Sequence, residues 1–195
     1  MKRLAFILID GFADWEGALL SASAREQFGA DVRYFSPGGR SVTSIGGLSV
    51  LPNGPIEEMG FGDFDALIAI GSREWTRPEP RSAVAPLFAA AHAAGRVVGG
   101  ICAATLALAE AGLLDTRPHT SNARAFLIDF VAGYRGAAHY LDQPRAVAAD
   151  RVVSAAGSAP ASFAIETAKL LWPEKVKEIA DLNALFSAEH AAPRV

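Results

Sequence analysis

The chain of 195 residues holds one cysteine, Cys102, and only four histidines. A single cysteine excludes a disulfide within the chain and fits a reducing compartment. Protein metal sites recur as closely spaced ligands such as C-x-x-C or H-E-x-x-H, and the sequence has neither pattern. It also lacks the glycine-rich motifs that bind nucleotide phosphates. We therefore expect no metal and no organic cofactor.

Charge of one sign and long apolar runs are also scarce. The net charge is −3 with both signs mixed along the chain, so a nucleic-acid partner is not expected. The apolar run near the start, Leu4–Ile9, is shorter than the roughly 7–15 residues of a secretory signal core. No segment approaches the ~20 apolar residues that cross a bilayer. These features predict a cytoplasmic protein with no membrane partner.

The apolar residues that are present follow a regular order. Hydrophobic residues make up 51% of the chain, which is enough for the core of one domain over residues 1–195. Segments rich in β-branched residues alternate with segments rich in alanine and leucine, a pattern that predicts an α/β fold with a mainly parallel sheet and helices on both faces. Strands are expected at 4–9, 32–36, 42–45, 48–51, 64–70, 96–101, 146–149 and 152–156. Helices are expected at 15–28 (with Trp15 on the inner face), 82–94, directly after Cys102, and at 122–131, 161–171 and 173–188.

Cys102 stands where a strand turns into a helix. Two glycines, Gly99 and Gly100, precede the turn and small residues follow it. Such a turn lifts its central side chain clear of the sheet, as nucleophile elbows do, and the helix dipole favours thiolate over thiol. The alternative is a small buried hydrophobe, which is the usual role of a lone cysteine.

Ligands of parallel sheets bind beyond the carboxyl ends of the strands. Besides 99–102, two strand ends carry small or polar residues, at 10–16 and 71–75. Glu16 lies among apolar neighbours, so it is expected to be buried with a raised pKa, able to donate a hydrogen bond to a thiolate. Its alternative role is that of an acid at a helix start, and Asp10 and Asp14 compete with it.

Other candidates surround these two. Backbone amides at Gly71, Ser72 and Ala103 are expected to form an oxyanion hole, and Asn122 is expected to join them as an oxyanion or binding residue. Arg73, Glu74 and Trp75 either line a pocket or are solvated. His119 and Asn122 lie in a loop after the cysteine helix, where His119 could pair with Cys102. The alternative is a surface loop with Ser121 or Asn122 as the helix cap. His139 is a reserve candidate, whereas His92 is expected at the surface and His190 in the tail.

Taken together, these motifs resemble the ThiJ/PfpI superfamily, which shares the class I glutamine amidotransferase-like fold with the Parkinson-disease protein of the same group. The resemblance spans nearly the whole chain and rests on the segments 4–10, 14–17, 64–71, 99–102, 111–115 and 152–159. It implies a flavodoxin-like three-layer sandwich, a homodimer, and a reactive cysteine in a strained elbow in contact with Glu16. Many relatives carry a histidine where this chain has Asn122, and His119 lies three residues earlier. Either His119 reaches the thiol from a shifted loop, or the site works without a histidine base. For the dimer, Trp75, Phe61 and the C-terminal helix are surface candidates.

The resemblance leaves several functions open. One is a cysteine-dependent enzyme acting on a small carbonyl- or amide-like substrate, with Cys102 as nucleophile, Glu16 as proton donor or relay, and His119 as base if it reaches. Another is a redox or stress sensor that uses oxidation of Cys102. A PfpI-like protease ranks third, and an inert cysteine is the remaining alternative. Contact of the sulfur with Glu16 and His119 favours the enzyme, whereas contact with Glu16 alone favours the sensor.

Overall fold

A mostly parallel sheet forms the centre of the molecule, and its strand order brings distant segments together. The computed structural model describes residues 1–188, apart from the side chain of Phe61, so His190 and the Phe61 side chain lie outside the described part. The sheet has the order β5-β2-β1-β6-β7-β9-β8, and all neighbours are parallel except β8 and β9. Its strands are β1 (Arg3–Ile7), β2 (Asp31–Ser36), β5 (Gly54–Pro55), β6 (Ala66–Ala69), β7 (Val97–Ile101), β8 (Val147–Ala149) and β9 (Val152–Ala155). The short strands β3 (Val42–Thr43) and β4 (Ser49–Val50) pair separately as an antiparallel hairpin.

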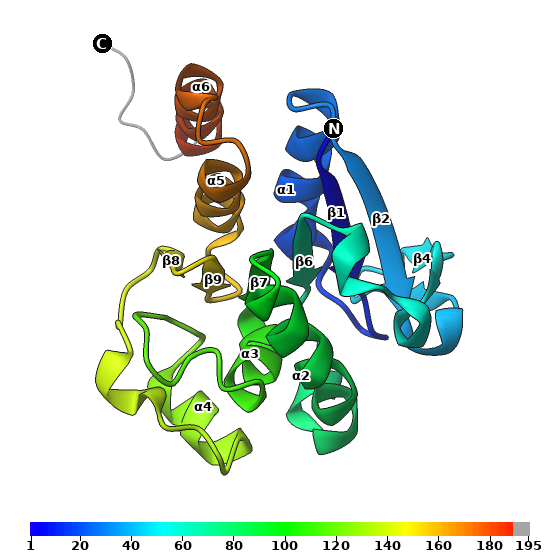
Figure 1. Ribbon diagram of the computed structural model, residues 1–195, viewed down its shortest axis with the longest axis vertical. Coiled ribbons are helices and arrows are strands. Elements are labelled where there is room, and N and C mark those ends of the chain that lie inside the picture. The colour runs from blue at the N-terminus through cyan, green and yellow to red at the C-terminus, as the bar shows by residue number, and fades with distance from the viewer. Residues whose placement is uncertain (189–195) are drawn as a thin grey trace.

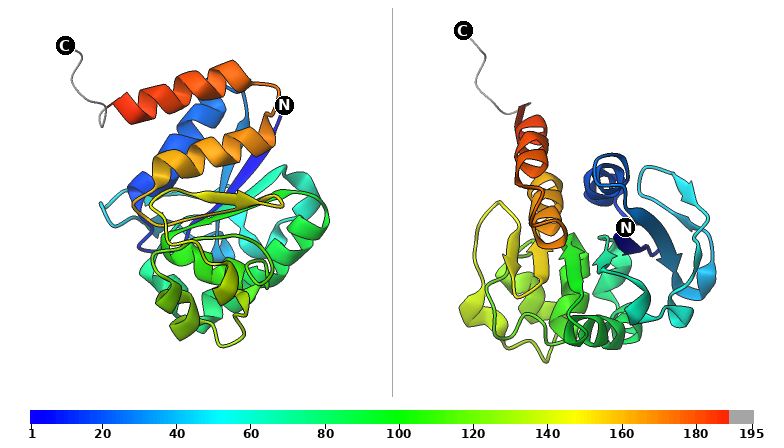
Figure 2. Two further views of the ribbon diagram at one scale, coloured as in Figure 1. Left: turned by 90° about the vertical axis from the view of Figure 1, so that its left-hand side faces the viewer. Right: turned by 45° about the horizontal axis from the view of Figure 1, so that its top comes forward.

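Helices cover both faces of this sheet (Figures 1 and 2). On one side lie α1 (Asp14–Glu26), α5 (Pro160–Leu171) and α6 (Val176–Ser187), with α6 packed on α5. On the other side lie α2 (Pro78–Ala93), α3 (Thr105–Glu110) and α4 (Arg124–Phe130). This confirms the predicted flavodoxin-like three-layer sandwich. No helix in the described part combines the length and apolar character needed to cross a bilayer.

The period of two in β1 explains why the sheet is covered on both sides. Leu4 and Phe6 belong to the core cluster that includes α1 and α5, whereas Ala5 and Ile7 belong to the cluster that includes α2 and α3. All four side chains are fully buried. Because successive side chains of a strand point to opposite faces, a continuously apolar strand must be covered twice.

Several boundaries differ from those expected. Helix α2 begins at Pro78 rather than at residue 82, because a proline at the first helical position lacks only an N–H that would be unpaired there. Helix α4 begins at Arg124, and neither Ser121 nor Asn122 caps it. Trp15 is 51% exposed instead of facing inward.

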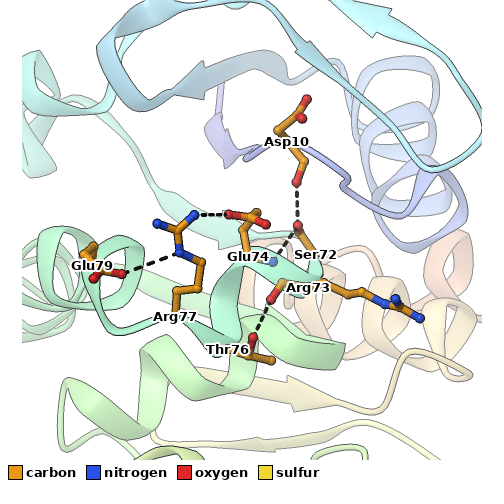
Figure 3. Close-up of polar contacts among 7 residues, drawn as sticks. All are labelled: Asp10, Ser72, Arg73, Glu74, Thr76, Arg77 and Glu79. Atoms are coloured by element: carbon orange, nitrogen blue, oxygen red, sulfur yellow. Dashed lines mark hydrogen bonds and ion pairs between the residues drawn. The ribbon is translucent and has the colours of Figure 1, made fainter.

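Hydrogen bonds within the loop after β6, and from this loop to neighbouring backbone, hold the loop in place. It forms a short 3₁₀ helix, Arg73–Thr76, in which Ser72 Oγ accepts a hydrogen bond from Glu74 N and donates one to the Asp10 carbonyl (Figure 3). Trp75 was expected at the surface as an interface candidate, but it is fully buried and its Nε1 donates to the Ile70 carbonyl at 2.8 Å.

Arg81 of α2 ties this loop to two other elements. It is 5% exposed, and its guanidinium donates to the carbonyl of Trp75, to the carbonyl of Phe130 at the end of α4, and to the Glu110 carboxylate in α3 at 2.7 Å. One buried cation therefore holds three segments in a fixed relation.

We expect the substitution Arg81→Met to lower the free energy of unfolding by about 2–4 kcal/mol, because it leaves carbonyls and a partly buried carboxylate without their partner. Chemical denaturation measures this. The control is Arg77→Gln on the same loop. Arg77 forms exposed ion pairs with Glu74 and Glu79, and their loss should lower the free energy of unfolding by no more than about 0.5 kcal/mol. Equal losses in the two variants would contradict the bracing role of Arg81.

Candidate active site

The carboxyl ends of four neighbouring strands meet at one edge of the sheet and assemble the site. Glu16 follows β1, in the first turn of α1, and Gly71 follows β6. Cys102 comes directly after β7, and Gly157 comes two residues after β9. Because β1, β6, β7 and β9 are consecutive in the sheet, residues 86 positions apart in the chain (102 − 16) become neighbours. Ligands of parallel sheets bind beyond such strand ends, so this edge is the candidate site.

Cys102 occupies a strained turn. Its φ of 58° lies in the left-handed region, which is sterically costly for a residue with a Cβ. The chain passes from β7 into a 3₁₀ turn at Cys102–Ala104 and then into α3. The turn is tight enough that a Cβ at Gly100 would lie 3.0 Å from the Ala104 carbonyl oxygen. Thr105 Oγ1 donates to the Cys102 carbonyl at 2.7 Å and stabilises the turn. The sharp strand-to-helix elbow expected from the sequence is therefore present.

Glu16 is the acid that reaches the thiol. It is 1% exposed, its Oε2 accepts a hydrogen bond from Gly71 N at 2.8 Å, and its carboxyl group lies next to the Cys102 side chain, where each influences the pKa of the other. Among residues 1–188, Oε1 has no nitrogen or oxygen partner. The competing acids are occupied elsewhere: Asp10 accepts from Thr43 N, and Asp14 accepts from Ser44 Oγ and the amide of the residue at position 46.

Two glycines allow the carboxyl group and the thiol to meet. A Cβ at Gly71 would lie 2.4 Å from Glu16 Oε2 and 2.6 Å from Cys102 Cβ. A Cβ at Gly157 would lie 2.8 Å from Glu16 Oε1 and 2.9 Å from Cys102 Sγ. All four distances are shorter than a real Cβ atom tolerates, so the pair is enclosed by backbone on two sides. The role of Gly157 escaped the sequence analysis, although its place after a parallel strand was a usable signal.

Burial dominates the electrostatics of the pair. Desolvation raises the pKa of Glu16 to about 7, against the opposing hydrogen bonds from Cys102 and the Gly71 amide. Desolvation, together with the negative charge of Glu16, raises the pKa of Cys102 to about 11. The expectation that the helix dipole lowers the thiol pKa is therefore wrong, because burial next to a carboxylate outweighs the short turn that follows the cysteine.

The two groups titrate as one unit. The first proton leaves near pH 7, and the second is held until about pH 11 because the first charge is already present. Between these values the pair carries one proton and one negative charge. Proton transfer from the sulfur to the carboxylate then yields thiolate beside a neutral carboxylic acid, without any net loss of a proton.

Asn122 and Ala103 stabilise the thiolate side of this equilibrium. Asn122 Nδ2 donates to Cys102 Sγ at 3.2 Å, and its Oδ1 accepts from Gly157 N at 3.0 Å. The Ala103 amide also donates to the sulfur and opposes the rise in the thiol pKa. Asn122 is thus held at the thiol by both ends of its amide, which explains why it does not cap α4.

His119 lies in the core and not at the sulfur. It is fully buried, with Nδ1 2.8 Å from the Arg117 carbonyl and Nε2 2.6 Å from the Tyr134 hydroxyl. A carbonyl only accepts, so Nδ1 carries the proton and Nε2 accepts from Tyr134. Burial lowers the pKa of His119 and keeps the ring neutral. Both nitrogens are committed, so of the two alternatives the geometry favours a site without a histidine base.

The backbone amides expected to form an oxyanion hole differ in whether they already have an acceptor within the protein. The Gly71 amide is engaged by Glu16, so it is not free to bind an oxyanion. The Ser72 amide has no acceptor among residues 1–188, and the Ser72 side chain is buried and turned to the Asp10 carbonyl. The Ala103 amide is engaged by the sulfur in the free protein, and it becomes available to an oxyanion once the sulfur bonds to carbon and loses its negative charge.

A pocket of about 480 Å³ opens on the pair. Its apolar walls are Trp15, Ile45 and Phe126, and Arg73 and Thr76 also line it. Trp15 is fixed by a hydrogen bond from Nε1 to the Gly157 carbonyl at 3.0 Å. Nothing in the sequence pattern identifies Ile45 or Phe126 as pocket residues, since they come from the β3–β4 hairpin and α4. Within residues 1–188, no three histidine, cysteine or acidic side chains gather closely enough to hold a metal ion.

The raised pKa of Glu16 predicts a dependence of stability on pH. In the unfolded chain Glu16 titrates near its ordinary value of 4.5, and in the folded protein near 7. Between these values the folded state binds the extra proton, so stability is greatest below pH 4.5 and falls as pH rises to about 7, by about 3 kcal/mol from this group. Glu16→Gln should remove this slope and be more stable than the wild type at pH 8.

Denaturation at a series of pH values measures the effect. Glu166→Gln, which neutralises a carboxylate paired with Lys169 on the outside of α5, is the matched control and should keep the slope. A Glu16→Gln variant that loses stability at pH 8, or keeps the slope between pH 4.5 and 7, would show that Glu16 is not a buried, proton-binding acid.

Comparison with known proteins shows the family to which the chain belongs. The sequence profile of the DJ-1/PfpI family matches residues 2–170. The protein named "Uncharacterized protease YoaZ" of Bacillus subtilis (strain 168) is 31% identical over 177 residues, which cover 87% of this chain and 83% of that one. The crystal structure of a DJ-1 superfamily protein from Agrobacterium tumefaciens is 43% identical, covers 98% of this chain and 100% of its own, and superposes with a TM-score of 0.89. Drosophila melanogaster DJ-1beta shares the fold at 20% identity and a TM-score of 0.73, covering 98% of this chain and 99% of its own. The chain is a member of the DJ-1/PfpI family.

Proposed function

We propose that this protein is a cysteine-dependent enzyme that adds Cys102 to the carbonyl carbon of a small substrate, with Glu16 as its acid and base. The observation that carries the proposal is the buried Cys102–Glu16 pair, which shares one proton at neutral pH and faces a pocket of about 480 Å³. Pockets of this size with apolar walls and a few polar groups are typical of small-molecule sites.

The first step follows from the positions of the atoms. The thiol proton passes to the Glu16 carboxylate, and Sγ attacks the carbonyl carbon, so that a C–S bond forms and the carbonyl π pair moves to oxygen. The Ser72 and Ala103 amides donate to this oxyanion. Glu16 then returns the proton to the oxygen, which gives a neutral covalent adduct and regenerates the carboxylate.

With a 2-oxoaldehyde the same groups can complete a turnover. Glu16 removes the hydrogen of the former aldehyde carbon as a proton and delivers it to the neighbouring carbon. The hydroxyl proton of the former aldehyde moves to the oxygen of the second carbonyl, so that this carbonyl becomes a hydroxyl group and the adduct becomes a thioester. Water hydrolyses the thioester to a 2-hydroxy acid and frees the thiol. The sum is addition of one water to the substrate, with no electrons gained or lost.

Peptide cleavage is less well supported, even though YoaZ carries the name of a protease. A cysteine protease needs a base that orients the thiol and then protonates the leaving amine. The ring nitrogens of His119 are both bonded elsewhere, so only Glu16 could serve both purposes.

We expect the wild type to convert a 2-oxoaldehyde such as methylglyoxal to the 2-hydroxy acid, as followed by NMR, and to leave a peptide substrate intact. Cys102→Ser should abolish turnover, and Glu16→Gln should reduce kcat by about 100-fold or more, because proton transfer at this position has no substitute. Glu166→Gln should retain full activity. Turnover that survives Cys102→Ser would refute the mechanism.

A second function, oxidation sensing, is favoured by the contact of the sulfur with Glu16 but not with His119. A peroxide oxidises the thiolate to a sulfenic acid and is itself reduced to water, and a second equivalent gives a sulfinic acid. The protonated carboxyl of Glu16 is placed to donate a hydrogen bond to the new oxygen, because Oε1 has no other nitrogen or oxygen partner among residues 1–188.

For this function we expect mild peroxide to add two oxygen atoms to the intact mass at Cys102, and the product to be more readily overoxidised in Glu16→Gln, which has no acid proton to donate. Mass spectrometry of the intact chain measures both. Because the chain has one cysteine, any oxygen that remains in Cys102→Ser marks methionine and sets the background. No addition above this background would exclude sensing.

A further inference from the structure

We infer that Arg73 binds a carboxylate of the substrate, so that the pocket selects small carbonyl compounds that carry a carboxylate a short distance from the reacting carbon. The carbonyl part of this inference rests on the proposed function. The carboxylate part rests on the charges and contacts around Arg73, and it can be tested without turnover.

The distribution of charge in the pocket is unequal. Among the described residues that line it, Arg73 is the one cation and Glu16 is the one acid. Glu16 is buried against Cys102, and its charge is shared with the thiol. The other walls are apolar or neutral, so a polar substrate meets a single positive group in the pocket.

Arg73 has no charged partner in the part of the chain that the structure describes. No carboxylate among residues 1–188 lies within ion-pair distance of its guanidinium, and its side chain is exposed. Arg77, on the same loop, pairs with Glu74 at 3.0 Å and with Glu79 at 3.7 Å. Figure 3 shows the Arg73 side chain extended away from these three residues, on the opposite side of the loop. The nearby acids therefore satisfy Arg77 and leave Arg73 available.

The backbone that carries Arg73 is held in place. Its carbonyl accepts from Thr76 Oγ1 at 2.8 Å, and the preceding Ser72 is hydrogen-bonded to both Asp10 and Glu74 (Figure 3). An anchor on a fixed loop costs less entropy on binding than one on a mobile loop. The planar guanidinium also matches a carboxylate through two parallel hydrogen bonds.

A cation in this pocket reduces the electrostatic repulsion that an anionic substrate meets there. After the first deprotonation the Cys102–Glu16 pair carries one negative charge, which repels a second anion. Arg73 in the same pocket offsets this repulsion by its opposite charge. The geometry thus assigns the carbonyl carbon to the sulfur, the carboxylate to Arg73 and the short carbon skeleton to the apolar walls.

Alkylation of Cys102 by two matched reagents tests this directly. Iodoacetate carries a carboxylate and iodoacetamide a neutral amide of nearly the same shape, and the full-length chain has only one thiol to react. The rate ratio of iodoacetate to iodoacetamide, divided by the same ratio for 2-mercaptoethanol, reports anion recognition alone. We expect Arg73→Gln to lower this ratio by about three- to fivefold, the range of an exposed charge pair, and Arg73→Lys to retain part of it.

Arg77→Gln makes the same change of net charge on the same loop and is the control. It should leave the ratio at the wild-type value, and the iodoacetamide rate should be equal in the wild type and all three variants, which shows that thiol and fold are intact. An unchanged ratio in Arg73→Gln, or an equal fall in Arg77→Gln, would overturn the inference, the latter because it would indicate only the general field of the surface.

Competition extends the test from reagents to carbonyl compounds. Pyruvate should slow the alkylation by iodoacetamide at lower concentrations than pyruvamide does, and Arg73→Gln should abolish the difference. Equal protection by the two compounds in the wild type would contradict carboxylate recognition. Since neither measurement needs turnover, a protein without carbonyl activity would refute the proposed function and still give a clear result for Arg73.

Discussion

The contact between the Glu16 carboxyl and the Cys102 thiol is the constraint on which the rest of the site depends. Two acidic groups can lie together in the interior only if they share a proton, since two buried charges of one sign repel each other strongly. Around this contact the chain has left-handed backbone at Cys102 and glycines at positions 71 and 157, where any Cβ would separate the pair. Each of these features costs stability, and each brings the sulfur and the carboxyl group together.

The sheet supplies the rigidity that this contact needs. Four consecutive parallel strands, covered on both faces, fix the ends from which Glu16, Gly71, Cys102 and Gly157 emerge. Arg81 then holds the loop after β6 against α3 and α4, the elements that follow the cysteine. A change in the packing of α2 would therefore reach the pocket wall through one buried guanidinium, although α2 contributes no residue to the pocket.

The sequence allowed the fold and the two central residues to be predicted because both follow from local patterns. Apolar strands alternating with helices predict a parallel sheet, and polar residues after adjacent strands must meet at its carboxyl edge. The partners of His119 could not be predicted in this way, since Tyr134 and the Arg117 carbonyl reach it only through the tertiary packing of a loop. The predicted positions of Trp15 and Trp75 were wrong for a related reason. Hydrophobicity alone does not distinguish a side chain in the core from one in a pocket wall at the end of a sheet.

No histidine within residues 1–188 contacts the Cys102 sulfur, and this restricts the reactions that the site can catalyse. With His119 committed to the core, Glu16 is, among residues 1–188, the one group in contact with Cys102 that can both take and return a proton near neutral pH. A reaction in which the proton removed from the thiol returns to the adduct leaves such a site unchanged after each cycle. Addition to a carbonyl has this property. Cleavage of an amide makes a further demand on the same carboxyl group, because an amine must be protonated before the C–N bond breaks, whereas a thiolate leaves a thioester without this help.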